Sequence, residues 1–196
     1  MRLFPLYLLL ATASVQALTF EELVQAAQDR TQQQVRYDGR YFAIDYPGGD
    51  VPAGLGVCTD VVIRSYRRLG IDLQQLVHED MKRHFALYPS KRIWGLSATD
   101  PNIDHRRVPN LQVFFSRHGQ VLATSNNPQD YQPGDLVTWM LPGNLPHIGI
   151  ISDNKAASGN LMVVHNIGQG PVEDDSLLRF PITGHYRYLP ASSLPQ

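Results

Sequence analysis

The order of the hydrophobic periodicities along the chain constrains the fold most. Four segments in the first 118 residues carry apolar side chains at helical spacing, and from Gln132 onwards the apolar residues form short runs separated by Gly, Pro and Asn. We expect helices at about 20–34, 58–69, 72–85 and 109–118, and strands at 136–141, 147–151, 161–165 and 186–189. Helices first and an antiparallel sheet afterwards is the layout of an α+β domain. The sequence therefore predicts a single α+β domain.

The first residues form a separate segment. Arg2 is followed by an apolar stretch at 3–10 and by small residues that end at Ala17, a pattern typical of a secretory signal peptide. The stretch is too short to anchor the chain across a bilayer, and a buried N-terminal helix is the alternative. We expect residues 1–17 to be a signal peptide, and the protein to be exported to the periplasm or secreted, without a membrane anchor in the mature chain.

The mature chain, residues 18–196, contains no internal repeat, low-complexity tract or linker long enough to divide it. Thr19 and Glu22 have the spacing of a capping box, so a helix is expected to begin where the signal peptide ends. Over all 196 residues Lys plus Arg number 17 and Asp plus Glu number 18, and this balance does not favour a nucleic-acid partner. Because the chain has one cysteine, Cys58, it forms no internal disulfide and has no CxxC site.

Cys58 follows a glycine-rich loop and opens a predicted helix. The free N–H groups and the dipole of a helix N-terminus stabilise an anion, so we expect the pKa of this thiol to be lowered and the thiolate to act as a nucleophile. The same N–H groups could bind the oxyanion that forms when a carbonyl is attacked. The alternative is a buried, inert cysteine that packs as a small hydrophobic residue.

Two of the seven histidines, His147 and His165, adjoin apolar strands. If the two strands pair symmetrically about the loop at 152–160, these side chains face each other, and one imidazole orients the other as a base. Alternatively, both lie exposed at the rim of the sheet. Cys58 and these histidines could also ligate zinc, but the chain lacks HExxH and any short ligand pair, so no metal is predicted.

Several segments resemble the NlpC-type cysteine peptidases, the papain-like bacterial cell-wall hydrolases. Residues 58–73 resemble the nucleophile helix of that family, and the matching flanking segments are Tyr46-Pro47-Gly48-Gly49, Gln132-Pro133-Gly134-Asp135-Leu136-Val137, Pro146-His147-Ile148-Gly149-Ile150 and Val164-His165. The family usually has Asp-Cys-Ser where this chain has Val57-Cys58-Thr59-Asp60, and the connection at about 74–131 is longer than usual. We therefore place the chain in a divergent branch, close to an uncharacterised family of exported bacterial proteins.

The resemblance implies a papain-like fold in which N-terminal helices pack on a small antiparallel sheet. It implies that Cys58 is the nucleophile, His147 the base and His165 its orienting partner, with Tyr46 as a hydrogen-bond donor to the oxyanion. The expected substrate is a peptide or amide bond in peptidoglycan, cleaved through an acyl-enzyme without a cofactor. The alternatives are a non-catalytic module that binds peptidoglycan or a partner protein, and an acyl transferase that uses the same thiol.

Two adjacent arginines, Arg106 and Arg107, lie in the long insert. Arginine binds a carboxylate through two parallel hydrogen bonds, and peptidoglycan stem peptides carry free carboxylates. We therefore predict that Arg106 or Arg107 binds a substrate carboxylate at the rim of the Cys58 cleft. The alternative is a solvent-exposed ion pair with Asp104, which would contribute little to stability.

Overall fold

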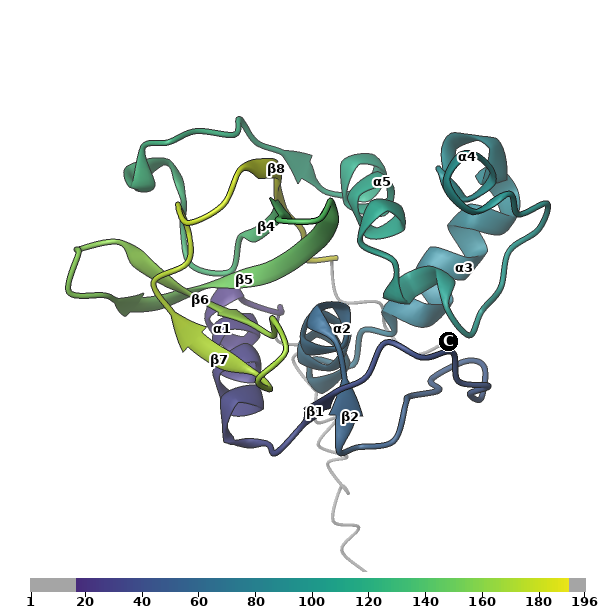
Figure 1. Ribbon diagram of the computed structural model, residues 1–196, viewed down its shortest axis with the longest axis horizontal. Coiled ribbons are helices and arrows are strands. Elements are labelled where there is room, and N and C mark those ends of the chain that lie inside the picture. Colours follow the sequence, from purple (N-terminus) through teal and green to yellow (C-terminus); the bar gives the residue numbers. More distant parts are fainter. Residues whose placement is uncertain (1–16, 191–196) are drawn as a thin grey trace, which may run out of the picture.

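A six-stranded antiparallel sheet makes up one side of the molecule, and helices α3, α4 and α5 lie on the other (Figure 1). The structure, a computed structural model, describes residues 17–190. The strands of the six-stranded sheet run in the order β3-β8-β4-β5-β6-β7. They are β3 (Gln120–Val121), β4 (Leu136–Leu141), β5 (Leu145–Lys155), β6 (Leu161–His165), β7 (Val172–Asp174) and β8 (Ile182–Arg187). The helices are α1 (Phe20–Gln28), α2 (Cys58–Arg68), α3 (Leu73–His84), α4 (Ser90–Trp94) and α5 (Val108–His118). The predicted α+β fold class is confirmed.

Short elements complete the chain. Two two-residue strands, β1 (Arg36–Tyr37) and β2 (Leu55–Gly56), pair in parallel just before α2. Four 3₁₀ turns lie at Asp29–Gln32, Phe85–Leu87, Asp104–Arg106 and Pro128–Asp130. The expected signal peptide lies outside the described residues except for Ala17.

Helix α1 begins where the capping box predicted and ends earlier than expected. The Thr19 hydroxyl accepts from the Glu22 N–H at 3.2 Å, and the Glu22 carboxylate accepts from the Thr19 N–H at 2.9 Å. The helix was expected to reach residue 34, but it ends at Gln28. Residues 28–34 are all polar, so no apolar face remains to hold a further helical turn against the core.

Helix α2 forms the centre of the molecule, between α1 and β5. Its first turn is closed by Asp60, whose carboxylate accepts from the Val57 N–H at 2.7 Å, and the chain leaves the helix at Gly70, which has a φ of 78°. All nine residues from 58 to 66 are buried. Cys58 is therefore held at the start of a helix that packs on every side.

The sheet is covered on both faces. On one face Ile148, Ile150 and Val164 pack against α2 and α5 around Tyr66 and Phe115. On the other face Trp139, Ile151 and Val163 form a smaller cluster with Leu177. Successive residues of a strand point to opposite faces, so the apolar runs that predicted β5 and β6 supply both clusters.

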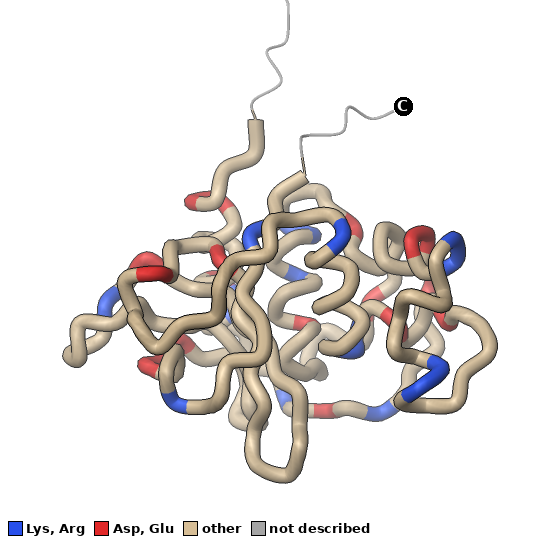
Figure 2. Tube along the Cα trace, turned by 90° about the horizontal axis from the view of Figure 1, so that it is seen from above, with Lys and Arg blue, Asp and Glu red and all other residues tan. Residues whose placement is uncertain are grey.

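The segment at 74–131, expected as an insert, contains most of α3 together with α4, α5 and β3. Residues 88–108 were expected to form a loop, but they include the helix α4. Lys and Arg are interspersed with Asp and Glu over the molecule (Figure 2). Within residues 17–190, no helix has the length and apolar character needed to cross a membrane.

Candidate active site

Cys58 is the first residue of α2, and its side chain is buried, with a relative exposure of 5%. Burial raises the pKa of the thiol to about 12, although the N–H groups of Ile148, Thr59 and Cys58 itself face the sulfur and oppose the rise. The expectation of a lowered thiol pKa is therefore wrong for the ligand-free protein. A helix N-terminus favours the thiolate, but removal from water outweighs that effect here.

His147 and His165 contact each other across β5 and β6. His147 Nε2 lies 2.9 Å from His165 Nδ1, and the rings meet edge to face with their centroids 5.1 Å apart. Symmetrical pairing about the 152–160 loop would place them directly opposite each other. In the structure Ile150 pairs with Val164 and Ile151 with Val163, a register two residues away from the symmetrical one, and the register shifts again between Ile151 and Lys155. A shift of two keeps the same face, so the histidines meet diagonally.

Gly149 makes this diagonal contact possible. It lies in the position opposite His165, and a Cβ atom there would be 2.7 Å from Val163 Cγ1 and 3.1 Å from His165 Cβ. Any larger residue would push β6 away from β5. The close approach of the two imidazoles therefore depends on a glycine between them.

Asp174, at the end of β7, fixes the tautomers of both rings. Its carboxylate oxygen Oδ1 lies 2.9 Å from His165 Nε2 and can only accept when ionised, so Nε2 of His165 carries a proton. In the neutral ring, His165 Nδ1 then accepts from the Nε2–H of His147. His147 Nδ1 is left with a free lone pair, as a general base requires.

The electrostatics support this neutral, ordered state. Burial, together with the smaller effect of His165, lowers the pKa of His147 to about 3. Burial also lowers the pKa of His165, against the opposing effect of Asp174. Hydrogen bonds from Ser176 and His165 lower the pKa of Asp174 despite its partial burial, so this carboxylate is ionised near neutral pH.

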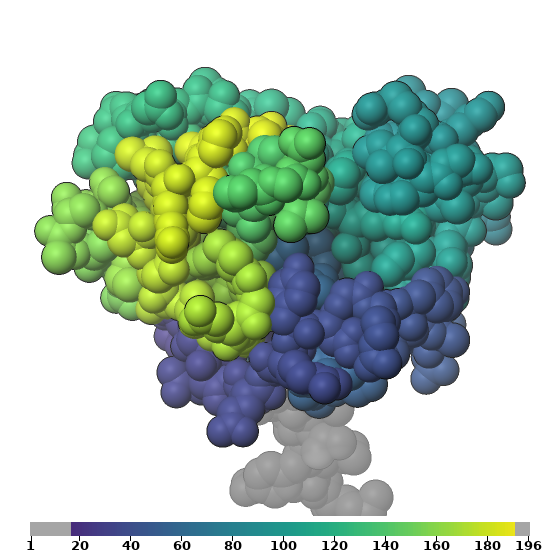
Figure 3. Space-filling model, viewed as in Figure 1, coloured from purple at the N-terminus to yellow at the C-terminus, as the bar shows by residue number. Residues whose placement is uncertain are grey.

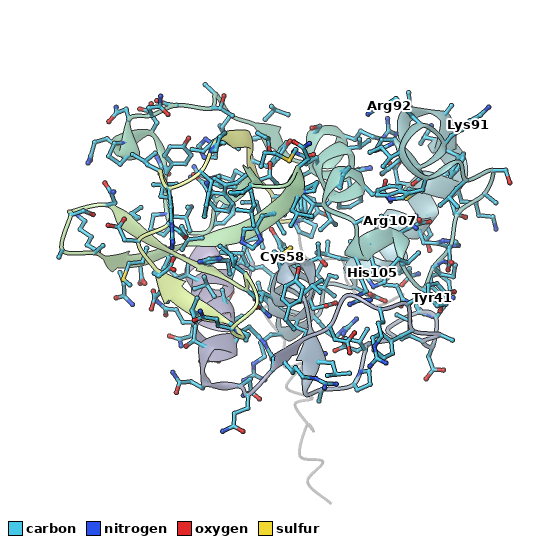
Figure 4. The ribbon with its side chains drawn as sticks, viewed as in Figure 1. Tyr41, Cys58, Lys91, Arg92, His105 and Arg107 are labelled. Atoms are coloured by element: carbon cyan, nitrogen blue, oxygen red, sulfur yellow. The ribbon has the colours of Figure 1, made fainter. Side chains whose placement is uncertain are left out.

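The thiol contacts the backbone of β5 one residue after His147. In the described part of the chain no hydrogen bond joins Cys58 Sγ to either imidazole, and the sulfur faces the N–H of Ile148, the residue after His147. The Cys58 side chain lies near the middle of the molecule in Figure 4. Figure 3 shows a hollow between the green β4–β5 hairpin and the teal helical part, with blue atoms of the chain region around α2 at its floor.

Tyr46 does not take the place that the sequence predicted for it. Its ring packs edge to face on His78 of α3, with centroids 4.9 Å apart, and it is 41% exposed. The tyrosine beside the thiol is Tyr37, which pairs with Gly56 just before α2. Burial raises the pKa of Tyr37, and the charge of Cys58 is the second cause. Sequence analysis missed Tyr37 because a two-residue strand has no periodicity to detect.

Arg106 is buried and cannot meet a substrate as predicted. Its side chain is 2% exposed, and its Nε and Nη2 atoms donate to the two Asp60 carboxylate oxygens at 2.9 and 3.0 Å. The cause is Asp60 itself, because a carboxylate buried in the first turn of α2 needs a counter-ion.

Arg107 also has partners within the protein. Its guanidinium lies over the Trp94 ring at 4.2 Å from the centroid and contacts Asp104 at 3.3 Å. Its side chain is 18% exposed, so the predicted surface pair with Asp104 exists but is largely covered. Figure 4 places Arg107 to one side of Cys58, toward the helical part of the molecule.

A cavity of about 940 Å³ lies between α4, α5 and β8, and none of the candidate catalytic residues lines it. A smaller cavity of about 190 Å³ is lined by His165 and Asp174. Within residues 17–190, no group of three or more His, Cys, Asp or Glu side chains is arranged to hold a metal ion.

A family model described as a domain of unknown function, DUF1287, matches residues 24–188. The chain belongs to the DUF1287 family. The uncharacterized protein YijF of Escherichia coli (strain K12) is 51% identical to it over 174 residues, which span 89% of this chain and 84% of YijF. These two findings confirm the expectation that the chain lies close to an uncharacterised family.

Two solved structures are similar to this DUF1287 chain. NlpC1 from Trichomonas vaginalis is 17% identical with a TM-score of 0.45, and the match covers 86% of this chain and 44% of NlpC1. NlpC2 from the same organism is 16% identical with a TM-score of 0.43, and the match covers 86% of this chain and 47% of NlpC2. This chain thus spans less than half the length of either protein.

Proposed function

We propose that this DUF1287 chain is an exported cysteine hydrolase that cleaves peptide or amide bonds in bacterial peptidoglycan. Cys58 is the nucleophile, His147 the general base and His165 the residue that orients it. One observation carries the proposal: the hydrogen-bonded series Asp174–His165–His147 leaves a single free lone pair at His147 Nδ1. The backbone N–H of the residue after this ordered base, Ile148, faces the sulfur of the helix-terminal cysteine, and a thiol with an oriented imidazole base supplies the groups that nucleophilic catalysis requires.

The mechanism begins with a neutral Cys58 thiol and a neutral His147 imidazole. Because the thiol pKa is raised to about 12 and the His147 pKa is lowered to about 3, the resting pair is S–H and imidazole, without a preformed ion pair. Sulfur attacks the carbonyl carbon as His147 Nδ1 takes the thiol proton. The imidazolium that forms is stabilised through His165 by the Asp174 carboxylate.

The later steps use the same groups. The oxyanion of the tetrahedral intermediate accepts from the N–H groups at the start of α2, those of Cys58 and Thr59. His147 then gives its proton to the leaving amine, the C–N bond breaks and a thioester remains on Cys58. Water, deprotonated by His147, attacks the thioester, releases the carboxylic acid and restores the thiol.

The experiment is digestion of purified peptidoglycan sacculi by the mature chain, residues 18–196. The wild-type protein is expected to release muropeptide fragments whose masses identify the cleaved bond, and Cys58→Ala is expected to release none. Cys58→Ser is the matched control, because it replaces the thiol by a hydroxyl of similar size that lacks the reactivity of a thiol. Release of the same fragments by Cys58→Ala would contradict the proposal.

A non-catalytic module that binds peptidoglycan is the second candidate. The buried thiol, which makes no hydrogen bond to an imidazole in the described structure, favours it. The same experiment separates the two functions. A silent module would co-sediment with sacculi, in the wild-type and Cys58→Ala forms alike, without releasing fragments.

A further inference from the structure

The small cavity beside His165 and Asp174 lies on the side of the site formed by the loops before and after β7. Its volume is about 190 Å³, and Ile167, Arg179 and Phe180 line it together with the two site residues. The loop at 166–171, between β6 and β7, also approaches the start of α2, because Asn166 and Pro171 share a surface with Val57 and Asp60. The cavity is therefore an extension of the candidate active site.

Arg179 is the positively charged residue that lines this cavity. Its side chain is exposed, and within residues 17–190 its guanidinium makes no ion pair and no hydrogen bond. The guanidinium lies over the Phe180 ring, 5.3 Å from the centroid. Arg106 and Arg107, by contrast, are both paired with carboxylates of the protein.

Two observations indicate what this guanidinium faces. Its positive charge contributes to lowering the pKa of both His165 and Asp174, so it lies within electrostatic range of the site. The Asp174 carboxylate interacts with His165 and Ser176 and forms no ion pair with Arg179. The five hydrogen-bond donors of Arg179 thus remain available at a cavity whose lining is apolar at Ile167, Val172 and Phe180 and polar at Gln169, His165 and Asp174.

We propose that this cavity is a subsite that binds a carboxylate of the ligand, held by the Arg179 guanidinium. Guanidinium binds carboxylate through two parallel hydrogen bonds, and Ile167 and Phe180 cover the apolar atoms next to it. As a substrate subsite the inference rests on the proposed function, and it selects peptides that carry a free carboxylate near the scissile bond. It gives Arg179 the role that the sequence predicted for Arg106 or Arg107.

The first test needs no turnover. The wild-type protein is titrated with glutarate and, separately, with glutaramide, which has the same length and no charge, while the imidazole resonances of His165 and His147 are followed by NMR. Glutarate is expected to shift the His165 resonances and to raise the His165 pKa, because it neutralises a nearby cation. Glutaramide is expected to do neither.

Two variants complete this test. Arg179→Gln is expected to abolish the response to glutarate, and Arg92→Gln, which changes an exposed arginine on α4, is expected to keep it. An equal response to glutaramide, an unchanged response in Arg179→Gln, or no response of the wild-type protein to glutarate would overturn the proposal.

The second test uses two stem peptides that differ only in whether the carboxylate next to the scissile bond is free or amidated. Arg179→Gln is expected to raise KM at least tenfold for the free acid and to leave KM for the amidated peptide unchanged. Equal effects on both peptides would overturn the subsite and leave the proposed hydrolase standing. A specific response to glutarate in a protein that cleaves neither peptide would leave the carboxylate site standing and remove the hydrolase.

Discussion

Cys58 and Asp60 are two residues apart in the first turn of α2, and both are buried. Asp60 pairs with the guanidinium of Arg106 at 2.9 Å. The backbone N–H groups that face Cys58 do not offset its burial and the nearby charge of Asp60, so its thiol stays protonated. The sequence predicted both residues to lie at a helix start, but burial depends on packing by distant segments and has no local signature.

The raised thiol pKa predicts slow alkylation that depends steeply on pH. At pH 7.5 a thiol with a pKa of about 12 is ionised about three-thousandfold less than a model thiol with a pKa of about 8.5. We expect the rate of Cys58 alkylation by iodoacetamide to rise continuously from pH 7 to about 11, without a plateau. Glutathione is the control, and a plateau for Cys58 below about pH 9 would contradict the prediction.

Asp174 is predicted to act as a positioning residue through His165. Replacing it by Asn removes the ionised acceptor and allows the amide to donate instead, which permits the opposite tautomers of His165 and His147. We expect Asp174→Asn to lower kcat about 10- to 100-fold with little change in KM, and to alter the tautomers seen in the ¹⁵N shifts of the imidazoles. Asp175→Asn is the neighbouring control, and unchanged ¹⁵N shifts in Asp174→Asn would contradict the role.

Arg106 is predicted to matter for stability rather than for substrate binding. Arg106→Gln leaves the buried Asp60 carboxylate without its counter-ion, and we expect unfolding free energy to fall by about 3–5 kcal/mol. Arg107→Gln, which removes a partly exposed pair, is expected to change it by less than about 1 kcal/mol. Chemical denaturation measures both, and equal small losses would show that the Asp60–Arg106 pair is not required.

At the scale of elements, periodicity located the longer segments and missed the short ones. Helices α2, α3 and α5 and strands β4 and β6 lie within a few residues of their predicted bounds. The five-residue α4 and the three-residue β7 were missed, and with β7 the sequence analysis missed Asp174. An acidic run, Glu173-Asp174-Asp175, is more typical of a loop than of a strand, and the strand is revealed by the antiparallel pairing of β7 with β6.

Gly149 is predicted to be needed for the pairing of β5 with β6. A methyl group there meets Val163 Cγ1 at 2.7 Å and the Val164 carbonyl oxygen at 3.0 Å, so the strands must separate. We expect Gly149→Ala to lower the unfolding free energy by about 1–3 kcal/mol and to abolish activity, because the contact between the histidines is lost.

Gly54→Ala is the matched control for Gly149→Ala. The nearest atom to a Cβ at Gly54 is a carbonyl oxygen at 4.0 Å, so we expect a change within about 0.5 kcal/mol. Stability and activity of both variants are measured by thermal unfolding and by peptide turnover. A Gly149→Ala protein with normal stability and activity would contradict the account of the register.

At the scale of the whole molecule, the site is assembled from segments far apart in the sequence. Cys58 begins a central helix, His147 and His165 come from neighbouring strands, and Asp174 comes from the edge strand β7 (Figure 1). The sequence predicted the thiol and both histidines, because helix starts and strand ends can be recognised locally. Tyr37, Asp174 and Arg179 join the site through long-range packing, which one sequence does not reveal.

We also predict where the signal peptide is removed. The capping box at Thr19 and Glu22 starts the folded domain directly after Ala17, so removal of residues 1–17 would leave α1 intact. We expect the exported protein to begin at Leu18, as measured by its intact mass. A soluble exported protein that retains the leader would contradict this prediction.

The proposed mechanism requires Cys58 to form a covalent acyl intermediate, which can be trapped. Mature protein is mixed with a stem peptide that it cleaves, quenched with acid within its turnover time and digested for tandem mass spectrometry. We expect the acyl fragment to be attached to Cys58 as a thioester that hydroxylamine removes, and His147→Ala to accumulate none. Peptide cleavage without a Cys58 adduct, and with Cys58→Ala as active as the wild-type protein, would contradict the mechanism.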